Sequence, residues 1–159
     1  MNQMRKIAFL KATIFVIGLV IFLLCVFLVP IFKSQQWLTN PEYADVKFWL
    51  CIGLYSTVIP FYIALYQTVK LLDCMKGSEA FSDIAIRSLQ AIRNCAFAIV
   101  SIYITGLLYA ALSDALQNGI FLMGTVVIFS ASVISVFAMV LEELLRNAME
   151  IKSENDLTV

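Results

Sequence analysis

The sequence predicts an all-helical, polytopic membrane protein in which four transmembrane helices form a bundle. Three observations predict this class. Apolar residues make up 62% of the 159-residue chain and charged residues only 14%, whereas soluble domains carry about 45–50% and about 25%. Four long stretches of the chain carry no charged residue. The basic residues between these stretches gather on one predicted side of the membrane.

Each uncharged stretch reaches the length of about 20 residues with which a helix crosses a bilayer. Lipid offers the backbone no hydrogen-bond partner, so each stretch must be helical. The first is too long for a signal peptide and does not end in the small residues of a cleavage site. The predicted spans, all within one membrane domain of residues 1–159, are about 12–32, 48–69, 94–113 and 119–141.

The distribution of basic residues predicts the orientation. Nine of the 11 Lys and Arg residues lie in the two terminal segments and the middle loop, and two lie in the first loop. Loops rich in Lys and Arg stay in the cytoplasm. We therefore expect a bacterial plasma-membrane protein with both termini in the cytoplasm.

Small and weakly polar residues recur at helical spacing along three spans, which is typical of helix contacts in lipid. The first span carries the fewest, so we expect it to be the most exposed to lipid. Close packing is the expected role of these residues, and a ligand-lining face is the alternative. They are Gly53, Thr57, Pro60, Ala64 and Gln67 in the second span, Asn94, Ala98, Ser101 and Thr105 with the neighbouring pair Gly106 and Ala110 in the third, and Gly124, Ala131, Ser135 and Ala138 in the fourth.

Pro60 lies near the middle of the second span, where it lacks an N–H and frees the carbonyl of Ser56. The hydroxyls of Ser56 and Thr57 could compensate locally. A kink is expected there, and a functional hinge is the further hypothesis.

The residues that most enzymes and ion-coupled transporters need are missing. Histidine is absent, and the predicted spans contain no ionisable Asp, Glu, Lys or Arg of the kind that marks a proton or ion path. The four cysteines form no C-x-x-C pair, and no phosphate-binding or nucleophile motif occurs. We expect no enzyme, no cofactor and no metal. The formal charge of zero argues against direct nucleic-acid binding.

Two cytoplasmic segments could carry function. The first, about 82–93, is an amphipathic helix that runs into the third span, with Phe81 anchoring its start. It is expected to lie on the membrane surface or to cover the cytoplasmic end of the bundle. On this segment, Arg87 and Arg93 are the expected partners of acidic residues beyond the fourth span.

The second segment is the tail, 142–159, in which an apolar stripe continues the helix of the fourth span to Ile151. Glu142 and Glu143 are its expected contacts with the two arginines. Disorder is favoured for the last residues, as for most termini. The alternative is a recognition peptide that presents Leu157, Val159 and a free carboxylate.

Three parts of the chain carry a resemblance to a known family: Ile59–Gln67, Ala80-Phe81-Ser82 with Leu89 and Ile92, and the ending Ile151–Val159. In these residues the chain resembles the YoaS-like family of small four-span bacterial membrane proteins, a family of unknown function. The resemblance implies a plasma-membrane protein but no activity and no catalytic residue. It also implies a small helix-turn-helix regulator as a DNA-binding partner, because such proteins often lie beside one in the genome.

The function that the sequence favours is a non-enzymatic membrane protein, regulatory or binding, that engages a cytoplasmic protein partner. The alternative is a small transporter or immunity-type protein that acts within the bilayer and needs an open path along Gly53–Gln67. A homo-oligomer is neither predicted nor excluded. The partners that the sequence implies are therefore the lipid bilayer and a cytoplasmic protein.

Overall fold

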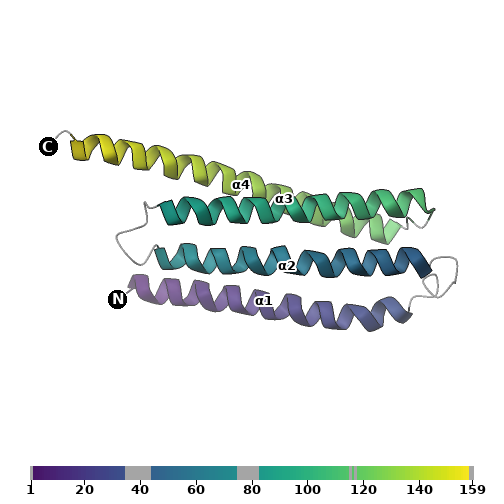
Figure 1. Ribbon diagram of the computed structural model, residues 1–159. Coiled ribbons are helices and arrows are strands. Elements are labelled where there is room, and N and C mark those ends of the chain that lie inside the picture. Colours follow the sequence, from purple (N-terminus) through teal and green to yellow (C-terminus); the bar gives the residue numbers. More distant parts are fainter. Residues whose placement is uncertain (1, 35–43, 75–82, 115, 117, 158–159) are drawn as a thin grey trace.

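The computed structural model describes residues 2–34, 44–74, 83–114, 116 and 118–157, and it contains four long α-helices. The start of α1 and the end of α4 lie at the same end of the molecule (Figure 1). The all-helical class and the number of helices are confirmed. In chain order the helices are α1 (Asn2–Ser34), α2 (Ala44–Cys74), α3 (Asp83–Leu112) and α4 (Asn118–Leu157).

The helices have the length and surface of membrane spans. Three are long and apolar enough to cross a bilayer, over Phe48–Cys74, Asp83–Leu112 and Asn118–Glu154, while α1 has a shorter apolar stretch, Ile7–Leu23, among its described residues. Large apolar side chains lie exposed along every helix; Phe129, for example, is 70% exposed. Apolar surface of this extent aggregates in water. The chain is therefore an integral, multi-pass membrane protein.

Hydroxyl groups on the lipid-facing sides are bonded within their own helices. The hydroxyl of Thr105 donates to the carbonyl of Ser101 at 2.8 Å, and that of Ser130 to the carbonyl of Val126 at the same distance. Such bonds to the carbonyl four residues earlier satisfy a polar group that lipid cannot. Weakly polar residues can therefore face lipid in this fold.

The helices pack in chain order. α2 packs extensively against α3, and α3 against α4, which crosses it at an angle (Figure 1). Among the described residues α4 has no packing contact with α1 or α2. The bundle is therefore open, and α3 is its central helix.

In the part of the chain that the structure describes, α1 packs against α2 alone, and sparsely, which agrees with the expectation that it is the most exposed helix. The hydroxyl of Tyr62 donates to the carbonyl of Gly18 at 2.8 Å. A Cβ on Gly18 would lie 3.2 Å from Cδ1 of Leu65, so the glycine allows a close approach at this point. Near the helix ends, the amino group of Lys11 pairs with the carboxylate of Asp73.

The predicted contact stripe of the fourth span is confirmed. Gly124, Ala131, Ser135 and Ala138 are all buried. A Cβ on Gly124 would lie 2.9 Å from Cδ2 of Leu107, so α3 and α4 approach closely there.

The predicted contact stripe of the third span is wrong. Asn94, Ala98, Ser101 and Thr105 are exposed. The reason is that the serine and threonine hydroxyls bond to their own helix and need no neighbour. The residues of α3 that are buried are Ala85, Ser88, Leu89, Ala96 and Ala110.

The two residues of the neighbouring pair, Gly106 and Ala110, have different surroundings. Ala110 is fully buried, whereas a Cβ on Gly106 would meet nothing within 4 Å. Ala110 therefore belongs to the core of α3, but Gly106 does not mark a close approach of two helices.

The second span keeps its small residues on the packed side. Thr57 is buried, Gly53, Pro60 and Gln67 are half-buried, and a Cβ on Gly53 would lie 4.0 Å from a methyl group of Ile102 on α3. α2 continues through Pro60 without interruption and shows no sharp bend (Figure 1). The Thr57 hydroxyl donates to the carbonyl of Leu54 at 2.6 Å and not to that of Ser56.

Candidate functional site

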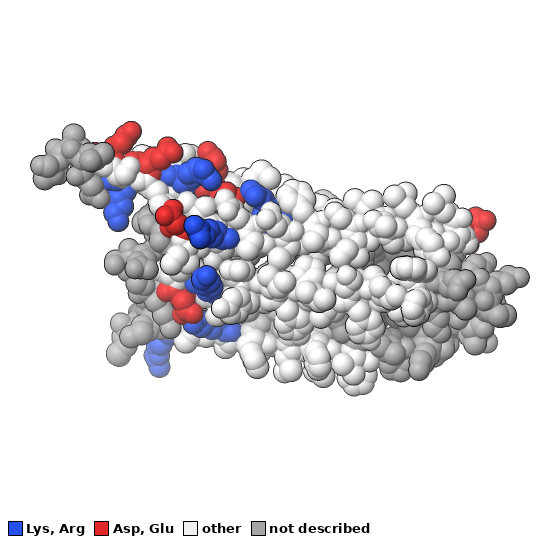
Figure 2. All heavy atoms as spheres, viewed as in Figure 1, with Lys and Arg blue, Asp and Glu red and all other residues white. Residues whose placement is uncertain are grey.

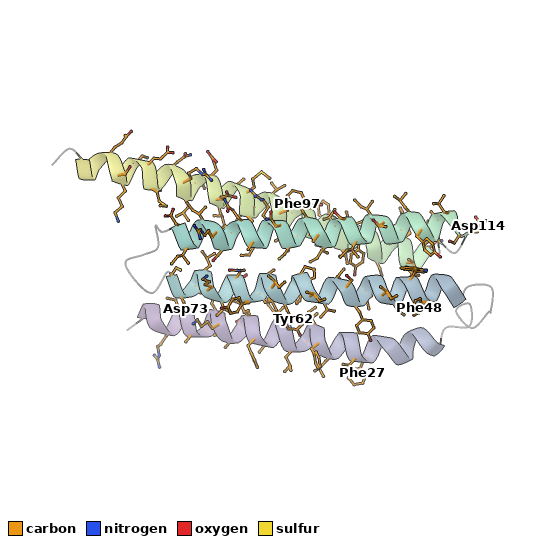
Figure 3. All side chains as sticks on the ribbon, viewed as in Figure 1. Phe27, Phe48, Tyr62, Asp73, Phe97 and Asp114 are labelled. Carbon is orange, nitrogen blue, oxygen red and sulfur yellow. The ribbon has the colours of Figure 1, made fainter. Side chains whose placement is uncertain are left out.

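Charged side chains gather at one end of the molecule, where α1 and α3 begin and α2 and α4 end (Figure 2). We call this region the charged end. The middle of the visible face is free of charge (Figure 2). Asp114, which lies in the left-handed region at φ 51°, is at the opposite end (Figure 3). All the candidate partner-binding residues that the structure describes belong to the charged end.

Glu142 is the centre of a polar cluster between α3 and α4. Its side chain is only 9% exposed, which is unusual for a carboxylate. Nε2 of Gln90 donates to one carboxylate oxygen at 2.7 Å, and Nη1 of Arg93 to the other at 2.8 Å. Nη2 of Arg146 approaches the first oxygen at 3.5 Å, one turn along α4. We call these four residues the Glu142 cluster. A carboxylate enclosed to this degree requires such partners, because burying it alone would be costly.

The sequence places Glu142 in this position by periodicity. It continues the contact stripe of α4 by a step of four residues beyond Ala138, after steps of seven, four and three residues from Gly124. On α3, Gln90 and Arg93 are three residues apart and so share a face. Along the span the residues of this stripe are small, and the next residue in the stripe is Glu142, which lies beside the polar part of α3.

Of the predicted ion pairs between α3 and α4, one is confirmed, and those that involve Arg87 or Glu143 are wrong. Arg93 meets Glu142 as expected. Arg87 and Glu143 are exposed, and neither forms an ion pair with any described residue. Each residue turns a helix by about 100°, so Glu143 points away from the face that Glu142 shares with α3. Gln90 was not among the predicted contacts, although its spacing from Arg93 was the available signal.

The segment 83–93 is the beginning of α3 and not a separate helix. α3 runs unbroken from Asp83 to Leu112, and this part packs through Ala85, Ser88 and Leu89. Phe81, the predicted anchor, lies outside the described residues. An acidic side chain in the first turn, Asp83, suits the positive end of the helix dipole.

The predicted continuation of the fourth helix to Ile151 is confirmed, and α4 runs on to Leu157, whereas the sequence favours disorder for the last residues, 152–159. α4 has 40 residues and α3 has 30, and the last part of α4 projects beyond the start of α3 (Figure 1). We call residues 143–157 the α4 extension. α4 ends at Leu157, and Val159 lies outside the described residues.

A groove of about 360 Å³ opens between the start of α3 and the α4 extension. Ile86 and Met149 are its half-buried apolar residues, and the residues exposed at its rim are charged or polar. We call this the α3–α4 groove. It is lined by Asp83, Ile86, Arg146, Met149, Glu150 and Ser153.

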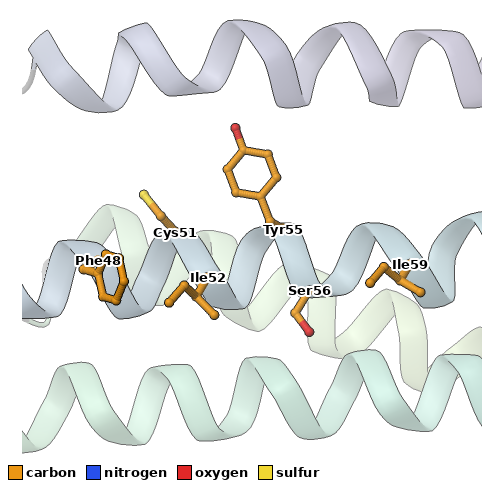
Figure 4. Close-up of a pocket in the computed structure, with 6 residues that line it drawn as sticks. All are labelled: Phe48, Cys51, Ile52, Tyr55, Ser56 and Ile59. Carbon is orange, nitrogen blue, oxygen red and sulfur yellow. The ribbon is translucent and has the colours of Figure 1, made fainter.

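A second hollow, of about 420 Å³, lies on α2. Cys51 and Tyr55 point toward α1 and Ser56 points toward α3 (Figure 4). The described residues that line it all belong to α2. It does not include Gly53, Thr57, Pro60 or Gln67, the residues proposed from sequence to line a path. The lining residues are Phe48, Cys51, Ile52, Tyr55, Ser56 and Ile59.

Two buried serines complete the polar groups of the core. The hydroxyls of Ser88 and Ser135 have no hydrogen-bond partner among the described residues. Both residues are at most 2% exposed, so they act as small side chains that allow close packing. The described residues contain no group of three His, Cys, Asp or Glu able to hold a metal ion.

Comparisons with known proteins place the chain in a family. Residues 32–159 match the model of a family described as protein of unknown function (DUF2975). The chain belongs to this family. It is also 45% identical to the uncharacterized membrane protein YoaS of Bacillus subtilis (strain 168), over 163 aligned positions that cover 100% of both proteins. The resemblance to YoaS-like proteins is therefore confirmed. No solved structure matches the chain.

Proposed function

We propose that this DUF2975 protein is a four-span protein of the bacterial plasma membrane that binds a cytoplasmic protein through its charged end and has no enzymatic activity. The observation that carries the proposal is the α4 extension. It continues a membrane helix as a charged helix that projects beyond its neighbours (Figure 1). Such an element presents side chains to the aqueous phase from a fixed base.

The orientation follows from the basic residues at the charged end. Arg5, Lys11, Lys70, Arg87 and Arg93 all lie in the parts of α1, α2 and α3 at that end. Lys and Arg next to spans are retained in the cytoplasm. With α1 as the first span, both termini are then cytoplasmic. A small helix-turn-helix regulator is one form that the partner can take, as the family resemblance implies.

The Glu142 cluster supports the proposal because it fixes the base of the α4 extension. Two hydrogen bonds of 2.7 and 2.8 Å join α4 to α3 where the extension begins. A helix held at its base loses less conformational freedom on binding than a free tail does. The transporter or immunity-type alternative has less support, since none of Gly53, Thr57, Pro60 and Gln67 is among the described residues that line the hollow on α2.

Two experiments test the proposal. In variants with the native cysteines replaced, Asp114→Cys should react with a membrane-impermeant maleimide outside intact cells, and Glu143→Cys only after the membrane is opened. The reverse pattern would overturn the orientation. For function, the proteins that copurify with the intact chain are compared with those of a chain ending after Arg146, which keeps the Glu142 cluster and lacks most of the α4 extension. At least one cytoplasmic protein should be lost, and identical sets would contradict binding through the extension.

A further inference from the structure

The α3–α4 groove combines an apolar floor with an acidic rim. Its floor is formed by Ile86 of α3 and Met149 of α4, and Asp83 and Glu150 stand exposed beside them. Among the described residues that line the groove, Arg146 is the one cation, and it lies 3.5 Å from the carboxylate of Glu142 and so faces an acid already. The rim therefore offers carboxylates to a ligand that enters from the water.

Charge is divided unevenly over the charged end. From residue 142 to residue 154, α4 has four glutamates against one arginine and one lysine. Together, the ends of α1, α2 and α3 at the charged end have six Lys and Arg residues against two acids, Asp73 and Asp83. The cytoplasmic leaflet is anionic, so it attracts the basic helix ends and repels the acidic extension. The α4 extension is thereby kept in the water, with its groove accessible from the cytoplasm.

We propose that the α3–α4 groove binds a basic amphipathic helix of a cytoplasmic protein. This inference rests on the proposed function and names the chemistry of the partner. The apolar face of such a helix, with anchors three and four residues apart, fits the floor at Ile86 and Met149. Its Lys and Arg side chains cover apolar surface with their stems and reach the carboxylates of Asp83 and Glu150 with their heads.

An acidic occupant is disfavoured by the same geometry. An anionic lipid headgroup or an acidic peptide would meet Asp83 and Glu150 at the rim, and Arg146 is already shared with Glu142. Like charges brought together at an interface are repulsive and exclude the wrong partner. The groove therefore selects by charge as well as by shape.

The test uses the full-length protein in discs of zwitterionic lipid and a fluorescent 18-residue peptide of leucine and lysine in an amphipathic pattern. A leucine–glutamate peptide of the same pattern is the control. The basic peptide should bind at one site, and Glu150→Lys should weaken binding by roughly tenfold. Met149→Gln should weaken binding as well, since it makes the floor polar. Glu143→Lys, the same charge change outside the groove, should change binding less than about threefold.

Several results would overturn the inference. These are no binding of the basic peptide, stronger binding of the acidic one, or equal losses in Glu150→Lys and Glu143→Lys, which would mean that the net charge alone attracts the peptide. The proposed function fails separately. If copurification still requires the α4 extension but is unchanged by Glu150→Lys and Met149→Gln, the protein binds its partner through another surface and only the groove assignment is wrong.

Discussion

The Glu142 cluster makes a quantitative prediction about how α3 and α4 are held together. Glu142→Gln keeps the size of the side chain but removes the charge that Arg93 and Gln90 share. A hydrogen bond to a charged group contributes about 1.5–3 kcal/mol, and removing one partner of a fully buried ion pair costs about 3–5 kcal/mol. The Arg93 side chain is 27% exposed and can reach water, so a loss of about 2 kcal/mol is expected.

The assay is the unfolding of the purified protein in mixed micelles at rising SDS, followed by circular dichroism. Glu143→Gln is the matched control, because the neighbouring glutamate is exposed and forms no ion pair with a described residue. It should change the free energy of unfolding by less than about 0.5 kcal/mol. Arg93→Gln should lower it, and the double variant Arg93→Gln with Glu142→Gln should lose less than the two single losses combined.

Two outcomes of the same unfolding assay would contradict the role of the Glu142 cluster. Equal effects of Glu142→Gln and Glu143→Gln would mean that the cluster does not stabilise the packing of α3 on α4. Additive losses in the double variant would mean that Arg93 and Glu142 act independently and that their 2.8 Å contact carries no coupling. Either result would also remove the argument that the α4 extension has a fixed base.

Four further substitutions test the packing. Gly124→Ala places a methyl group 2.9 Å from a leucine side chain and should cost about 1–3 kcal/mol in the same unfolding assay, whereas Gly106→Ala, with nothing within 4 Å, should not destabilise the protein. Ser135→Ala removes a buried hydroxyl without a described partner and should leave stability unchanged or raise it by up to about 1 kcal/mol; a larger loss would reveal a hydrogen bond. Tyr62→Phe should cost about 0.6 kcal/mol, as is usual between transmembrane helices, and a loss above about 2 kcal/mol would contradict the sparse packing of α1.

The parts of the fold set by strong local physics could be predicted from the sequence. Four uncharged stretches gave four helices, and the regular spacing of small residues identified the buried face of α4. On α3, the same kind of spacing predicted a buried face that is in fact exposed. Asn94, Ala98, Ser101 and Thr105 repeat as regularly, but a hydroxyl that bonds to its own helix has no need of a neighbour. Spacing alone does not distinguish these two cases.

The candidate site could be predicted only in part. Charge and periodicity placed Arg93 opposite Glu142, but they placed Arg87 and Glu143 there as well. The rotation and relative height of α3 and α4 decide which of these pairs meet, and they are set by contacts within the span, such as the close approach at Gly124. The helix was predicted as far as Ile151, but its continuation over residues 152–157 was missed because polar termini are usually disordered, whereas here these residues continue a helix that is already nucleated in the membrane.

The packing of each helix against its neighbour in the chain has a consequence for biogenesis. When α2, α3 and α4 leave the ribosome in turn, each finds its partner already in the bilayer, and no helix has to wait for a distant segment. Contacts between neighbours in sequence require little loop-closure entropy and form quickly. α1 is made first yet must remain in lipid until Tyr62 and Asp73 of α2 arrive.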